Sequence, residues 1–149
     1  MPRRYDRDEL RQVAAIRHLQ YIAAEAKAAR SASALRKKDE VRKESERARG
    51  AVEESWLDSL SAPSLQVEMS RLWSAELLVS ERTVRRAMAE AHAESAELAR
   101  RVAGLHAAAT RRDSAQEIVR KAAKARARRR EEIALQDASD RHAQRWSGR

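Results

Sequence analysis

The chain has 149 residues and a formal net charge of +9, with 37% charged and only 3% aromatic side chains. It contains no cysteine, which excludes a disulfide scaffold and a thiolate metal site. Its three glycines lie far apart, at positions 50, 104 and 148, and cannot form a Walker A loop or a dinucleotide-binding fingerprint. We therefore do not expect the chain to hydrolyse a nucleotide itself. The bias toward Ala, Glu, Leu, Lys and Arg is typical of long helices and coiled coils.

The first predicted element is a helix over about residues 6–60. Asp6 followed three residues later by Glu9 resembles a capping box at its start, with Asp in place of Ser or Thr. No sustained alternation of apolar and polar residues predicts a strand anywhere in the chain. The apolar stripe of this helix consists of Leu10, Val13, Ile16, Leu19 and Ile22 near its start and of Val41, Ser45, Ala48 and Val52 further along.

A bend over about residues 61–64 ends the first helix. Pro63 disfavours the α conformation at Ala62, so a helix arriving there should stop. Proline is favoured in the first turn of the helix that follows, and Ser61 or Ser64 can cap that helix.

The second predicted helix, over about residues 64–142, has the clearer periodicity. Its apolar positions are separated by alternating steps of four and three residues, which predicts a heptad seam and a left-handed supercoil. These positions are Val84, Met88, Ala91, Ser95, Leu98, Val102, Leu105 and Ala109.

Two long helices joined by a short connection predict antiparallel neighbours. The fold class is therefore all-α, a long two-helix antiparallel coiled-coil hairpin that forms a single domain over residues 1–149. Val41 should lie near the level of Arg85, Ile22 near Gly104 and Leu10 near Gln116. Beyond about Lys121 the second helix should have no partner in the chain, so residues 121–149 form a C-terminal overhang. A folded-over bundle of three or four helices is the alternative, although no second Gly or Pro break turns the chain.

Positive charge is concentrated toward the C-terminus, where residues 116–149 contain 10 basic and 5 acidic side chains. Such a segment suits an electropositive arm that enters an acidic cavity or binds nucleic acid. A solvated helix end whose charge favours the helix dipole is the structural alternative. The densest run consists of Arg120, Lys121, Lys124, Arg126, Arg128, Arg129 and Arg130.

A second candidate site lies beside the bend, where two of the three tryptophans fall among leucines. A two-helix tip cannot bury all these side chains, so they either lock the tip by packing on one another or offer an apolar patch to a partner. We expect at least one of the two indoles to be partly exposed. The patch is predicted from Trp56, Leu57, Leu60, Trp73 and Leu77.

Catalysis, metal binding and membrane insertion are not expected. The four histidines lack the Glu-x-x-His and His-Glu-x-x-His spacings of metal sites. Acidic side chains have basic neighbours three or four residues away, as in solvated helix faces. No stretch offers the ~20 apolar residues of a membrane span. The charged start lacks the apolar region of a signal peptide, which predicts a cytoplasmic protein.

Residues 37–43 (KKDEVRK) and residues 128–141 (RRREEIALQDASDR), within a basic, cysteine-free hairpin that bends near residue 62, resemble the flagellar and virulence type III export stalk family (FliJ/YscO). The resemblance extends over nearly the whole chain. The second stretch is similar to the charged terminus of that family. Trp56 and Trp73 stand where the family would be expected to carry Tyr or Phe near the tip.

This resemblance implies a non-enzymatic central stalk or adaptor without cofactor, which links a hexameric export ATPase to a membrane export gate. The basic run would then meet the ATPase ring, the tip would meet the cytoplasmic part of the gate, and export chaperones would be further partners. The protein would be peripherally associated with the membrane apparatus. A basic coiled coil that binds nucleic acid and a generic scaffolding coiled coil are the alternatives. The first is disfavoured because no aromatic residue lies between the basic ones to stack on bases.

Overall fold

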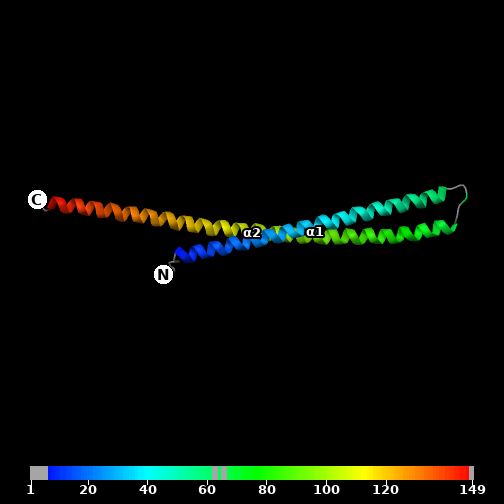
Figure 1. Cartoon of the computed structure of the whole chain (residues 1–149), viewed down its shortest axis with the longest axis horizontal. Coiled ribbons are helices and arrows are strands. Elements are labelled where there is room, and N and C mark those ends of the chain that lie inside the picture. The colour runs from blue at the N-terminus through cyan, green and yellow to red at the C-terminus, as the bar shows by residue number, and fades with distance from the viewer. Residues whose placement is uncertain (1–6, 62–63, 65–66, 148–149) are drawn as a thin grey trace. The chain divides into compact units, whose positions relative to one another are not determined.

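The computed structural model describes residues 7–61, 64 and 67–147, without the side chains at positions 7, 144, 145 and 147. Within these ranges the chain is all-α and consists of α1 (Arg7–Ser61) and α2 (Val67–Ser147), shown in Figure 1. The two helices pack against each other as an antiparallel hairpin, as the sequence predicts.

The observed helix bounds agree with the predicted ones to within about five residues. α1 begins and ends one residue later than predicted, whereas α2 begins three residues later and ends five residues later. The connection is therefore longer than the predicted bend, and Pro63 and Ala62 lie outside the described residues. Ser61 belongs to α1, where its hydroxyl donates a hydrogen bond to the Leu57 carbonyl at 3.0 Å.

The chain divides into two compact units, each built from a part of both helices. One unit comprises Ala24–Leu105, which contains the connection between the helices. The other comprises Met1–Ala23 and His106–Arg149. We call them the turn unit and the terminal unit and describe them separately. That they form a single domain stays a prediction.

In the turn unit, two observations establish the antiparallel arrangement of α1 and α2. Lys38 Nζ forms an ion pair with Glu90 Oε2 at 2.7 Å. Closer to the connection, Val41 and Ala48 of α1 line one groove with Thr83 and Glu76 of α2, so residue numbers rise on one helix as they fall on the other. The predicted level of Val41 near Arg85 is close to this arrangement.

The α2 residues that face α1 in the turn unit recur with steps of three and four, as a heptad pattern requires. Five of the eight predicted seam positions are correct, because Val84, Ala91, Leu98 and Leu105, and Ala109 in the terminal unit, are buried or half-buried. The other three are wrong: Met88 is 50% exposed, and Ser95 and Val102 are exposed as well. The observed α2 seam is Trp73, Leu77, Ser80, Val84, Ala87, Ala91, Glu94, Leu98 and Leu105.

The α1 seam in the turn unit is largely polar. Ser45 and Val52 face α2 as predicted, whereas Val41 and Ala48 are exposed. Long basic side chains occupy several of the facing positions and bury their aliphatic stems while their charged ends reach water. The observed α1 seam is Ala24, Ala28, Ser31, Leu35, Arg42, Ser45, Arg49, Val52, Trp56 and Ser59.

In the terminal unit, α1 faces α2 through a different stripe from the predicted one. Leu10 is half-buried, but Val13, Ile16, Leu19 and Ile22 are exposed, Leu19 by 65%. A step of three residues along a helix rotates the side-chain direction by about 60° less than a full turn, so repeated steps of three leave the face on which they start. Alternating steps of four and three residues remain on one face. The residues that meet this requirement are Leu10, Ala14, Arg17 and Tyr21.

A cation–π contact sets the register of the terminal unit. The Arg112 guanidinium carbon lies 4.1 Å from the centre of the Tyr21 ring, although the predicted register would place Tyr21 near Leu105. The longer connection accounts for part of this difference. The remainder follows because helical side chains tilt toward the N-terminus of their own helix, so that Arg112 reaches back along α2 by about one turn.

Few side chains are fully buried, as expected for a narrow, alanine-rich seam. In the described part of the chain the buried apolar residues are Ala28, Val84, Ala87 and Ala91 in the turn unit and Ala108 in the terminal unit. Four of these five are alanines, and alanine lets two helices approach closely while burying little apolar area.

Candidate functional site: a basic groove and an apolar surface near the turn

A groove of about 250 Å³ lies between the start of α1 and α2 in the terminal unit. Leu10 and Arg11 line it from α1, while apolar side chains, Arg126 and Arg130 line it from α2. α1 therefore still has neighbours on α2 beyond Lys121, which corrects the predicted start of the overhang. The α2 residues are Val119, Ala122, Ala123, Arg126, Ala127 and Arg130. We call this the basic groove.

The arginines of the basic groove differ from the arginines along the seam. Arg42 donates to Asp39 and Glu46, and these hydrogen bonds raise the pKa of its guanidinium above the ordinary value. A hydrogen bond to Glu53 does the same to the pKa of Arg49. By contrast, Arg11, Arg126 and Arg130 form no ion pair within the described part of the chain. Among the described residues, the groove is therefore lined by three arginines that no carboxylate pairs with.

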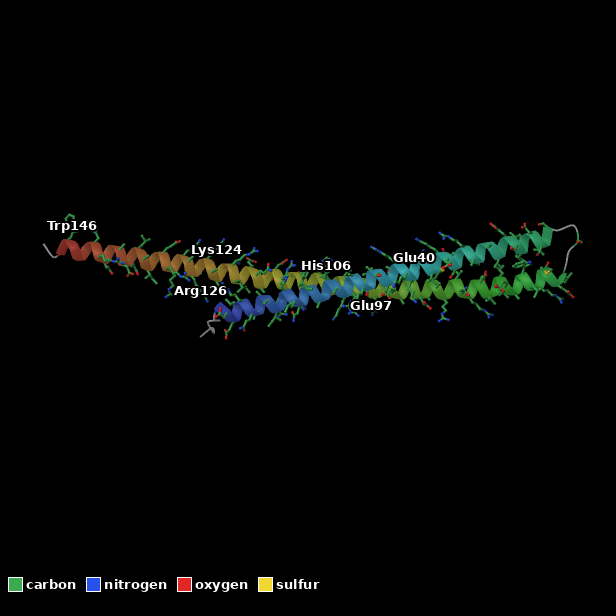
Figure 2. The ribbon with its side chains drawn as sticks, viewed as in Figure 1. Glu40, Glu97, His106, Lys124, Arg126 and Trp146 are labelled. Carbon is green, nitrogen blue, oxygen red and sulfur yellow. The ribbon has the colours of Figure 1, made fainter. Side chains whose placement is uncertain are left out.

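The structure brings only two of the seven predicted basic residues into the groove. Lys121 instead pairs with Glu117 on its own helix at 2.7 Å, which lowers the pKa of the Glu117 carboxyl. In Figure 2, Arg126 lies on the side of α2 that faces the start of α1, and Lys124 lies on the other side. Arg120, Lys124, Arg128 and Arg129 are exposed and form no ion pair among the described residues.

Beyond the groove, α2 continues through residues 131–147, which we call the α2 extension. Every described side chain from Ala127 to Trp146 is exposed. Trp146 is 77% exposed, and its ring stacks on that of His142 with centroids 6.2 Å apart. Within the terminal unit, Figure 1 shows no part of α1 beside this end of α2.

The candidate apolar patch is exposed in part. Trp56, Trp73 and Leu77 are half-buried, whereas Leu57 is 51% and Leu60 43% exposed. Further exposed apolar residues lie on the first turns of α2, namely Val67, Met69 and Leu72. Of these, sequence reasoning missed Val67 and Met69, because their exposure depends on which face of α2 forms the seam. We call these eight residues the turn-end surface.

A second groove, of about 310 Å³, lies in the turn unit. Glu44 of α1 and Glu76 of α2 line it together with Val41, Ala48 and Val79. It provides two carboxylates and no histidine. Among the described residues, no group of three or more His, Cys, Asp or Glu side chains could hold a metal ion. No described helix is both long and apolar enough to cross a membrane.

Sequence reasoning missed two contributors to the terminal unit. The sequence does not single out Arg11, because only the three-dimensional register reveals that it lies beside the basic run. It indicates the carboxylates of the α2 extension only as part of a charged terminus. Comparison of the chain with protein-family models, curated proteins and solved structures returned no match.

Proposed function

We propose that the protein is a non-enzymatic central stalk or adaptor of a bacterial flagellar or type III protein export apparatus. In this role it links a hexameric export ATPase to the cytoplasmic part of the export gate. Export chaperones are further partners, and the protein acts in the cytoplasm at the membrane apparatus. One observation carries the proposal: an antiparallel hairpin whose second helix continues past the start of the first and carries the basic run.

The exposed basic residues support the ATPase end of this proposal. Lys124, Arg128 and Arg129 lie where no carboxylate of the described chain neutralises them. Their positive charges can therefore attract an acidic pore. Electrostatic attraction of this kind accelerates association and orients the partners.

The turn-end surface supports the gate end. An indole that is half-buried by its own chain keeps part of its area for a partner, and such aromatic anchors supply much of the energy of protein interfaces. Replacing Trp56 or Trp73 by Ala should therefore weaken gate binding by more than the accompanying loss of stability explains. Equal losses in binding and in stability would mean that the indoles only hold the helices together.

The experiment that tests the proposal is crosslinking and affinity capture from the native cytosol. The wild-type bait should recover a hexameric ATPase. A bait with Lys124→Glu and Arg128→Glu should recover less of it. The matched control carries Arg36→Glu and Arg82→Glu, which change the net charge equally at exposed positions of the turn unit. Recovery of no ATPase, or equal losses with both charge-reversed baits, would contradict the proposal.

The same capture tests the alternative of nucleic-acid binding. Binding of the basic run to duplex DNA should weaken steeply with salt, because log K falls by ~0.9 per phosphate neutralised for each tenfold rise in salt. A nuclease-sensitive complex with this salt dependence would favour the alternative.

A further inference from the structure

Within the described part of the chain, the three arginines that line the basic groove form no ion pair, unlike Arg42 and Arg49 on the seam. Arg126 and Arg130 are one helical turn apart on α2, and Arg11 lies across the groove on α1. The other residues that line the groove are apolar, namely Leu10, Val119 and three alanines. Such a groove suits a helix that presents carboxylates beside small or apolar side chains, because guanidinium groups pair strongly with carboxylates.

A segment with this chemistry lies on the same chain, in the α2 extension. Residues 131–140 (EEIALQDASD) contain four acidic and no basic side chains. Asp137 and Asp140 are one turn apart, and Ile133 lies one turn before Asp137 on the same side of the helix. All three are exposed, and neither aspartate side chain forms an ion pair within the described chain. The extension cannot reach the groove of its own copy, since it continues the helix that forms one wall.

We propose that a second copy of this chain occupies the basic groove, and that the two copies exchange their α2 extensions in a two-fold symmetric, antiparallel dimer. Each extension lies in the groove of the other copy. The groove's unpaired guanidinium groups then receive carboxylates that only the second copy can supply. This goes beyond the proposed function, which needs a single copy, and it does not depend on that function.

One alignment satisfies the charges on both walls of the groove. If Arg126 faces Asp137 of the second copy, then Asp140 of that copy lies one turn further, at the level of Ala123, which lines the same groove as Arg11. The two-fold axis then passes close to residues 131 and 132. Arg130 lies within one turn of Glu131 and Glu132 of the second copy. Since the dimer is isologous, every one of these pairs occurs twice.

Sedimentation velocity of the full chain tests whether the dimer exists. We expect a monomer–dimer equilibrium that depends on protein concentration and weakens as salt rises, because most of its contacts are between exposed charges. A monomer at every concentration up to about 1 mM and at low salt would overturn the proposal, because even weak specific association is populated there.

Two charge-reversed variants and their mixture test the arrangement. The groove variant carries Arg11→Asp and Arg126→Asp, and the extension variant carries Asp137→Arg and Asp140→Arg. Each alone places like charges together and should raise the dimer dissociation constant at least about tenfold. The equimolar mixture should restore association, because each acidic partner then meets a basic one on both sides of the axis.

Helicity of both variants is measured by circular dichroism, which separates lost association from lost folding. A mixture no better associated than either variant would overturn the alignment, as would a wild-type affinity in either variant alone.

A second test uses the cysteine-free background. A variant with Arg126→Cys and Asp137→Cys, the pair that the alignment places face to face, should form disulfides between copies, whereas the single variant Arg126→Cys should not. Absence of the disulfide-linked dimer from the double variant would also contradict the register.

Discussion

Polar side chains at facing positions are the unusual feature of this hairpin at the scale of single residues. Serines on the seam satisfy their hydroxyls within their own helix, as Ser45 does by donating to the Val41 carbonyl at 2.8 Å. Ser59 and Ser80 make equivalent bonds to the carbonyls three residues before them. Among the described side chains, Ser70 Oγ is buried without such a partner. Local bonding thus lets small polar residues serve where apolar ones would be expected.

The ion pair between Lys38 and Glu90 makes stability depend on pH. Hydrogen bonds from Lys38, and then from Arg86, lower the pKa of the Glu90 carboxyl below its ordinary value of 4.5. The folded state therefore binds fewer protons at Glu90 than the unfolded state does in this range. The stabilisation is present above the ordinary pKa and is lost as pH falls through the lowered pKa of the folded chain.

Replacing Glu90 by Gln should flatten this acid dependence. We expect the free energy of unfolding of Glu90→Gln to fall less steeply with decreasing pH below about 4.5 than that of the wild type. Chemical denaturation at a series of pH values measures the free energy of unfolding of both proteins. Glu54→Gln is the control, because Glu54 is exposed and forms no ion pair within the described residues. An equal flattening in the control would show that Glu90 has no special role.

The contact between Arg112 and Tyr21 gives a test in the terminal unit. Tyr21→Leu removes the ring over which the guanidinium lies, whereas Tyr21→Phe keeps it. We expect Tyr21→Leu to lower the unfolding midpoint of the chain by up to about 4 °C relative to Tyr21→Phe. Differential scanning calorimetry measures the midpoint. Equal midpoints for the two variants would mean that the ring face contributes nothing measurable.

At the scale of the helices, the sequence suffices to predict helix number, order and approximate bounds. Charged, alanine-rich segments without strand signals favour helix throughout, and a proline is the one strong break between them. The phase of the seam, that is, which face of each helix contacts the other helix, is harder to predict, because apolar residues also lie outside the seam. Met88 and Val102 fit a heptad series as well as Ala87 and Ala108 do, and the structure selects the smaller residues for the close approach.

A matched pair of substitutions tests this phase. Val84 is 7% exposed, and Val84→Ala should lower the free energy of unfolding by about 1–2 kcal/mol through lost burial. Met88→Ala removes a larger side chain from an exposed position and should change it by less than about 0.5 kcal/mol. Urea denaturation compares the two. A larger loss in the free energy of unfolding for Met88→Ala than for Val84→Ala would indicate that Met88 belongs to the seam, as the sequence predicts.

At the scale of the whole molecule, the concentration of basic residues near the C-terminus is readable from the sequence, but their division into two sets is not. Which guanidinium groups face the groove depends on where α1 begins and on the phase of α2 at that level. Arg11 enters the site for the same reason. The apolar surface near the turn is predictable in part, since the leucines and indoles stand out in the sequence, whereas the exposure of Val67 and Met69 depends on which face of α2 forms the seam.

The two sets of basic residues should separate the two proposed associations. Lys124 and Arg128 lie away from the groove, and Arg11 and Arg126 line it. Lys124→Glu with Arg128→Glu should weaken binding to the ATPase ring at least about tenfold and leave the dimer dissociation constant within about twofold. Arg11→Asp with Arg126→Asp should do the reverse. Fluorescence anisotropy of a labelled chain titrated with the ring measures the first affinity, and sedimentation the second. If either variant lost both associations, one shared surface would serve both, and the ring and the second copy would compete for it.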